Sequence, residues 1–126
     1  MPTFNFARAA EQVLGPKYDL SLVFVASHRS RTLNHHYRGK DYSANVLSFP
    51  FDNQNGEMII DLEKLVAEAK RLGMSHRERL VEIFIHGLLH LKGLDHGSKM
   101  ESLESQLVRH FQKNNEQNNR HRVRCR

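Results

Sequence analysis

Three histidines in the second half of the chain have a spacing that suits a metal ion. His86 and His90 are four residues apart in a segment of helical periodicity, which places both imidazoles on one helix face. Gly93 then interrupts this helix, so the chain can turn back and bring His96 to the same ion. Three neutral imidazoles predict Zn²⁺, with Ni²⁺, Co²⁺ or Cu²⁺ as alternatives on affinity alone.

The same spacing indicates a catalytic site of a particular kind. Three protein ligands leave a fourth position open, where the pKa of a water molecule would fall towards ~7. The pattern H-x3-H-x2-G-x2-H is shared with metzincin peptidases, which need Glu directly after the first His as general base. Gly87 occupies that position here. A hydrolase could still work if the substrate is activated another way, and a phosphodiester would suit, because a metal and an arginine can stabilise its transition state.

Helical and strand patterns alternate along the segments that must position these histidines. Apolar periodicity predicts five helices, over 6–14, 27–37, 62–72, 76–91 and 98–111. Strands are predicted over 19–26, 46–49 and 57–60. Pro50 is expected to end the second strand, Ser27 and Asp61 to cap helices, and Ser75 with Glu78 to form a capping box. Interleaved helices and short strands predict an α+β fold with a small mixed sheet covered by helices.

Length, charge and cysteine content bound the class of protein. A chain of 126 residues predicts one domain, over residues 1–112. No apolar run reaches the ~18–20 residues of a membrane span. The N-terminus lacks a signal-peptide pattern and Cys125 is the single cysteine, so a cytoplasmic protein is expected. Residues 113–126 carry +4 of the net charge of +5 and are expected to form a disordered basic tail, which either contacts RNA or only solubilises the domain.

Two separated motifs resemble one protein family. Residues 86–96, HGLLHLKGLDH, resemble the HGxLHxxGxDH signature of the YbeY family of bacterial ribosomal-RNA maturation factors. Residues 33–51 resemble the family's LNxxYRxKDxxTNVLSFPF stretch, and Met100 with Glu104 matches its downstream M-x3-E. The resemblance covers about residues 19–112.

This resemblance implies a metal-dependent, single-strand-specific endoribonuclease that acts in 3′-end maturation of small-subunit ribosomal RNA and in ribosome quality control. It implies an α+β sandwich with a mixed, mainly four-stranded sheet and a metal at one end of a cleft. His86, His90 and His96 would be the metal ligands, and Arg38 a residue of catalysis or RNA binding. The expected partners are single-stranded ribosomal RNA and the ribosome or its small subunit, with an accessory protein left open.

Neighbouring residues have both a binding and a structural interpretation. Lys40, Asn45 and Ser48 are candidates for binding the substrate, but Asn45 and Ser48 could equally satisfy nearby turns. Asp95 either orients a ligand histidine through a hydrogen bond or caps its own turn. Phe51 is a candidate for stacking on a base.

Two other functions stay open at this point. A metallopeptidase would need a carboxylate from elsewhere in the chain, and Glu57 is the candidate. Glu57 is also where the family usually has Asp, and Ala44 stands where the family usually has Thr. A non-catalytic ribosome-binding module would use the metal for stability alone. The ribonuclease is favoured because two independent motifs occur in the right order.

Overall fold

The computed structural model describes residues 4–39, 44–95, 97–113 and 123–125, with the backbone alone for Arg38 and residues 123–125. Its helices are α1 (Phe6–Leu14), α2 (Ser27–Arg38), α3 (Leu62–Leu72), α4 (His76–Leu91) and α5 (Ser98–Lys113). Its strands are β1 (Asp19–Val25), β2 (Val46–Asp52), β3 (Asn55–Asp61) and β4 (Val123–Cys125). Across these described ranges, no helix has the length and apolar character needed to cross a membrane.

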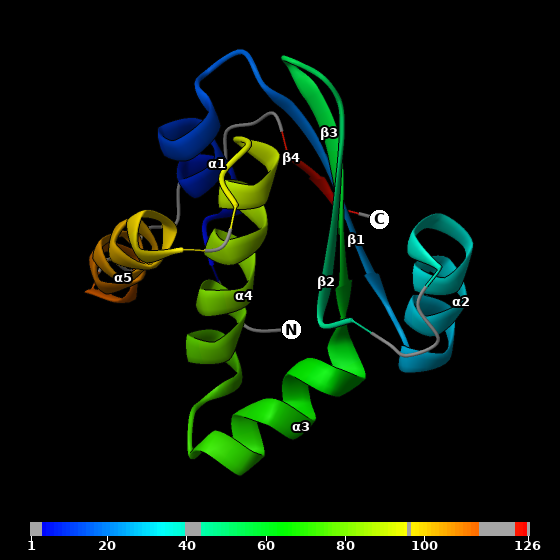
Figure 1. The fold of residues 1–126 in the computed structure, drawn as a ribbon. Helices are drawn as coiled ribbons and strands as arrows, with labels where there is room; N and C mark the ends of the chain where they lie inside the picture. The colour runs from blue at the N-terminus through cyan, green and yellow to red at the C-terminus, as the bar shows by residue number, and fades with distance from the viewer. Residues whose placement is uncertain (1–3, 40–43, 96, 114–122, 126) are drawn as a thin grey trace.

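One mixed sheet in the order β2-β3-β1-β4 forms the centre of the fold. β1 is parallel to β3 and to β4, whereas β2 is antiparallel to β3. Helices α1, α4 and α5 lie on one side of the sheet and α2 lies on the other, with α3 at one end (Figure 1). The predicted α+β fold with five helices is confirmed.

The body of the sheet consists of the three predicted strands, and β4 is a short addition of three residues. β4 lies in the segment for which the sequence predicts a disordered tail. Its backbone pairs with β1 instead, and so covers an edge that would otherwise present unpaired N–H and C=O groups. Residues 114–122 lie outside the described ranges.

Two predictions about element boundaries are wrong. Pro50 does not end β2, which continues to Asp52. Because β2 is an edge strand, its proline need not donate to a further neighbour, and the pairing with β3 shifts register between Pro50 and Asp52. Ser27 does not cap α2: Ala26 is the N-cap, and the Ser27 hydroxyl is hydrogen-bonded elsewhere.

Helix α4 forms the centre of the core. Its start is fixed by the predicted capping box, in which Ser75 and Glu78 each accept a hydrogen bond from the other's backbone. Phe84 is fully buried, with ring centroids of Phe6 and Phe4 at 5.0 and 5.9 Å. Phe4 also contacts Phe111 of α5 at 6.1 Å. This aromatic cluster fixes α5 against the same side of α4.

The buried carboxylate of Asp61 joins three elements at the end of β3. It accepts hydrogen bonds from the Ser27 hydroxyl at 2.7 and 2.9 Å and from the Lys64 backbone N–H at 2.9 Å. The Asp61 backbone N–H donates to the carbonyl of Asn45 at 3.0 Å. Asp61 therefore caps α3, as predicted, and also fixes the start of α2 and the entry to β2.

Replacing this carboxylate should destabilise the whole domain. We expect Asp61→Ala to lower the free energy of unfolding by about 2–4 kcal/mol, since a helix cap and a hydrogen bond to a charged group are both lost. Ser27→Ala, which removes one partner only, should cost about 1–2 kcal/mol. Urea denaturation followed by circular dichroism measures both. Equal stabilities of Asp61→Ala and the wild type would contradict this account.

Candidate active site

His86 and His90 converge, as their spacing on one helix predicts. Their Nε2 atoms are 3.1 Å apart, with ring centroids at 4.6 Å and the rings nearly perpendicular. Two imidazole nitrogens bound to one tetrahedral zinc ion would be about 3.3 Å apart, given Zn–N distances of about 2.0–2.1 Å. The observed pair is therefore close to the arrangement that a shared cation needs, and the donor set fits the implied metal.

The other ring nitrogen of His86 is held by a carboxylate from α5. Nδ1 of His86 is 2.8 Å from Oε1 of Glu104, and each side chain is 28% exposed. A carboxylate that accepts from Nδ1 fixes the ring orientation and places the ring's lone pair on Nε2, which is the tautomer that a metal ligand needs. The sequence offers Asp95 as a candidate for orienting a ligand histidine; for His86, the structure shows Glu104 in this position.

Helix α4 lies unusually close to the sheet beside His86. A Cβ on Gly87 would be 2.8 Å from Sδ and Cε of Met58 and 3.1 Å from Val46. The Ser48 hydroxyl donates to the Gly87 carbonyl at 3.0 Å. Gly87 occupies the position of the general-base glutamate in metzincin peptidases. Because it has no side chain, it also permits β2 and β3 to contact this turn of α4.

Asn45, Ser48 and Asp95 have the following surroundings. Asn45 Nδ2 donates to Glu68 Oε1 at 3.3 Å, and the same oxygen binds Arg79 at 2.8 Å. Ser48 is engaged with Gly87 as described above. Asp95 is exposed, beyond the C-terminal end of α4. Substrate binding by Asn45 and Ser48, and orientation of a histidine by Asp95, stay predictions.

Three predicted site positions fall outside what the structure describes. His96 and Lys40 lie in the omitted segments, and of Arg38 only the backbone is described, as the last residue of α2 before Gly39. Within the described ranges, no group of three or more His, Cys, Asp or Glu side chains is arranged to hold a metal. The observed part of the predicted ligand set is thus the pair His86 and His90.

Comparison with known proteins decides the family. The family model for "Endoribonuclease YbeY" matches residues 3–116, which is nearly the whole described chain. The chain belongs to the YbeY family of endoribonucleases. An "Endoribonuclease YbeY" from Campylobacter jejuni (strain 81-176) is 36% identical over 115 residues, covering 85% of each chain. One from Neorickettsia sennetsu is 40% identical over 95 residues, covering 71% of this chain and 66% of the relative.

A solved structure supports the fold. The solution structure of a Thermotoga maritima protein superposes with a TM-score of 0.64 at 23% sequence identity, covering 86% of this chain and 80% of that one. The YbeY resemblance seen in the two motifs is therefore confirmed, and with it the enzyme class of a nuclease, a hydrolase. YbeY proteins are in general metal-dependent nucleases.

The peptidase alternative loses its proposed carboxylate in this fold. Met58 of β3 lies against Gly87 of α4, and successive side chains of a strand point to opposite faces of the sheet. Glu57 consequently points to the face away from α4, opposite Phe49 of β2 in the ladder. It cannot serve as the general base at His86 and His90 without a change in the register of β3.

Sequence reasoning missed Glu104 as the partner of His86. Glu104 is 18 residues from His86, and no helix or strand repeat relates two residues that far apart. The contact arises from the packing of α5 on α4. The only signal was the M-x3-E match of the YbeY resemblance, which the residue types alone did not link to the histidines.

The contact between Glu104 and His86 should control metal affinity. We expect Glu104→Ala to weaken Zn²⁺ binding roughly 10–100-fold, because the orienting hydrogen bond of a ligand histidine is lost. Glu101→Ala, in an exposed position of the same helix, is the control and should bind as the wild type does. Competition with a chromophoric chelator measures both affinities. Unchanged affinity of Glu104→Ala would show that its carboxylate does not orient His86.

Proposed function

We propose that this YbeY protein is a single-strand-specific endoribonuclease for ribosomal RNA, which acts in 3′-end maturation of the small-subunit RNA and in ribosome quality control. Its metal is one Zn²⁺ ion or another divalent transition ion, held by His86, His90 and His96. The observation that carries the proposal is the 3.1 Å convergence of the two Nε2 atoms, with His86 fixed from behind by Glu104.

The metal and the neighbouring side chains would have separate roles in cleavage. A divalent cation would supply Lewis-acid stabilisation of the charge that develops when a phosphodiester is cleaved. Arg38, the last residue of α2, would bind a phosphate, for which a guanidinium offers paired N–H donors. Lys40 and Asn45 precede β2 in the sequence and Ser48 lies within it, and these residues would bind the RNA strand that enters the site.

We expect the enzyme to prefer single-stranded RNA. Bases of a duplex are stacked and paired, so side chains can reach only its backbone, whereas an unpaired strand presents bases that can be splayed apart. The ribosome or its small subunit would present such a strand, with or without an accessory protein.

A side-by-side assay of His90→Ala and the wild type tests the proposal. The wild type should carry about one metal ion per chain, by analogy with single catalytic zinc sites. Removing a direct ligand should cut cleavage of single-stranded RNA by at least ~100-fold, more than loss of an orienting partner does. His76→Ala, an exposed histidine at the start of the same helix, is the control. Equal cleavage by His90→Ala would refute the metal-nuclease site.

The nucleophile can be identified with a modified substrate. If the adjacent 2′-hydroxyl attacks, a single 2′-deoxy substitution at the scissile nucleotide abolishes cleavage, whereas attack by water leaves it intact. The cleavage products, separated on a denaturing gel, distinguish the two routes. Arg38→Ala should slow both, because the phosphate contact is common to them.

A further inference from the structure

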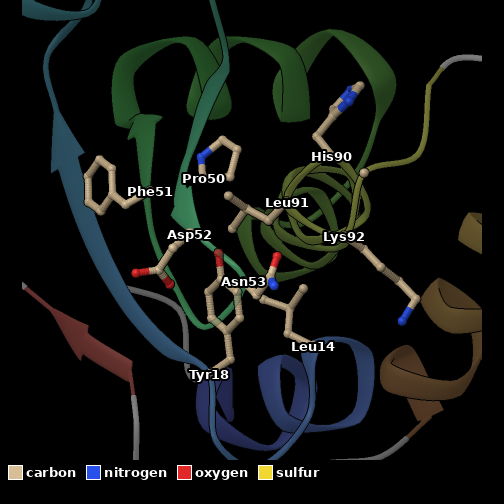
Figure 2. Close-up of a pocket in the computed structure, with 10 residues that line it drawn as sticks. Leu14, Tyr18, Pro50, Phe51, Asp52, Asn53, His90, Leu91 and Lys92 are labelled. Carbon is tan, nitrogen blue, oxygen red and sulfur yellow. The ribbon is translucent and has the colours of Figure 1, made fainter.

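Aromatic side chains gather on the face of β2 that points away from α4. Ser48 contacts Gly87 of α4, so the next residue of the strand, Phe49, points to the opposite face. Phe51 continues this face, and Figure 2 shows its ring on the side of β2 away from His90. The phenylalanines of β2 are therefore separated from the proposed metal ligands by the strand itself.

The end of α2 extends this face with two more rings. The ring centroids of Tyr37 and Phe49 are 5.2 Å apart, and those of His36 and Tyr37 are 4.6 Å apart. Tyr37 is 61% exposed and Phe51 is 66% exposed. Exposed apolar side chains that lie together, unlike scattered ones, mark interaction surfaces. We name Tyr37, Phe49 and Phe51 the aromatic patch.

Helix α2, beside the aromatic patch, is strongly basic. It contains three arginines and three histidines, and neither aspartate nor glutamate. Arg29 and His36 are both exposed, and their spacing of seven residues, two helical turns, places them on the same side of α2. His36 also contacts Tyr37 of the patch. This flank of α2 therefore suits an anionic partner that continues onto the aromatic rings.

The acidic residues on this side of the molecule belong to the sheet. Glu57 of β3 is opposite Phe49 in the ladder, and Asp19 begins β1 on the same face. A phosphate is consequently favoured over α2 and repelled over the sheet, whereas an uncharged base is tolerated beside either. Exposed rings next to cations are the composition of surfaces that bind single-stranded nucleic acids. An RNA strand with its backbone along α2 and its bases on the aromatic patch matches both parts of the surface.

We propose that the aromatic patch and the basic flank of α2 bind a single-stranded stretch of the RNA that lies outside the cleavage site. Its bases stack on Tyr37 and Phe51, and its phosphates lie along α2 near Arg29. Among the described strands β2 is at the edge of the sheet, so the RNA reaches the histidines by passing round one strand. The inference rests on the proposed ribonuclease function and adds a second contact surface to it.

The sequence contains no tryptophan, so a single one placed in the aromatic patch reports on stacking. In Phe51→Trp, a single-stranded 2′-O-methyl phosphorothioate RNA of about 12 nucleotides, which resists cleavage, should quench the emission of the metal-loaded full chain. Leu72→Trp is the matched control and should keep its emission, because this exposed residue ends α3, apart from β2 in Figure 1. A duplex of the same sequence should quench neither, since its bases are stacked on each other.

Affinities distinguish stacking from a structural effect. Phe51→Leu and Tyr37→Leu remove a ring and keep apolar bulk, so each should weaken binding of this RNA roughly 5- to 100-fold in fluorescence anisotropy. Phe51→Tyr and Tyr37→Phe keep the ring and should bind as the wild type does. Arg29→Gln should lower the slope of log affinity against log salt by about 0.7, the contribution of one phosphate contact to a single strand.

Three contrary outcomes are distinguishable. If RNA is bound and cleaved but leaves the emission of Phe51→Trp unchanged, or if Phe51→Leu and Tyr37→Leu bind as the wild type does, the second surface is refuted and the ribonuclease stands. An emission that changes with protein concentration in the absence of RNA, together with a dimer in sedimentation, would assign the aromatic patch to a second copy of the chain and refute the proposal. If the wild type neither binds nor cleaves RNA, the proposed function itself fails.

Discussion

Helix α4 contacts the sheet at Gly87, where even a methyl group would force Met58 to move. The histidines on either side of this contact, His86 and His90, are thereby held at a fixed distance from β2 and the hairpin. Ser48 strengthens the contact through the Gly87 carbonyl. One small residue thus sets how closely the helix turn that carries His86 approaches β2 and β3. A glutamate there would have to displace the end of the Met58 side chain and press on Val46, in addition to its different chemistry.

The second constraint is the position of α5. This helix is held by the aromatic cluster around Phe84, to which it contributes Phe111 through contact with Phe4. The exposed side of α5 is mostly polar. The helix nevertheless has a role in the site, because it brings Glu104 to His86. Core packing and ligand orientation are therefore coupled, since a shift of α5 would move the carboxylate away from Nδ1. The N-terminal segment, through Phe4, takes part in placing a residue of the site far along the chain.

Local rules predicted the parts of this molecule that depend on neighbours in sequence. The histidine pair follows from helix geometry, and the caps at Asp61 and Ser75 follow from residue types at fixed offsets. The rest depended on tertiary contacts. Glu104 of α5 contacts His86 of α4. The Ser27 hydroxyl donates to Asp61, 34 residues away, instead of capping α2.

The proline in β2 also affects how copies of this chain meet one another. β2 is at the edge of the sheet, and no strand among the described residues pairs with its outer side. An open edge invites the same edge of a second molecule to add to it, which is a common route to aggregation. Pro50 has no N–H to offer such a partner, and the shifted register beside it bends the strand. The outer edge of β2, near the histidines, is thereby left unpaired while being a poor partner for the same edge of another copy.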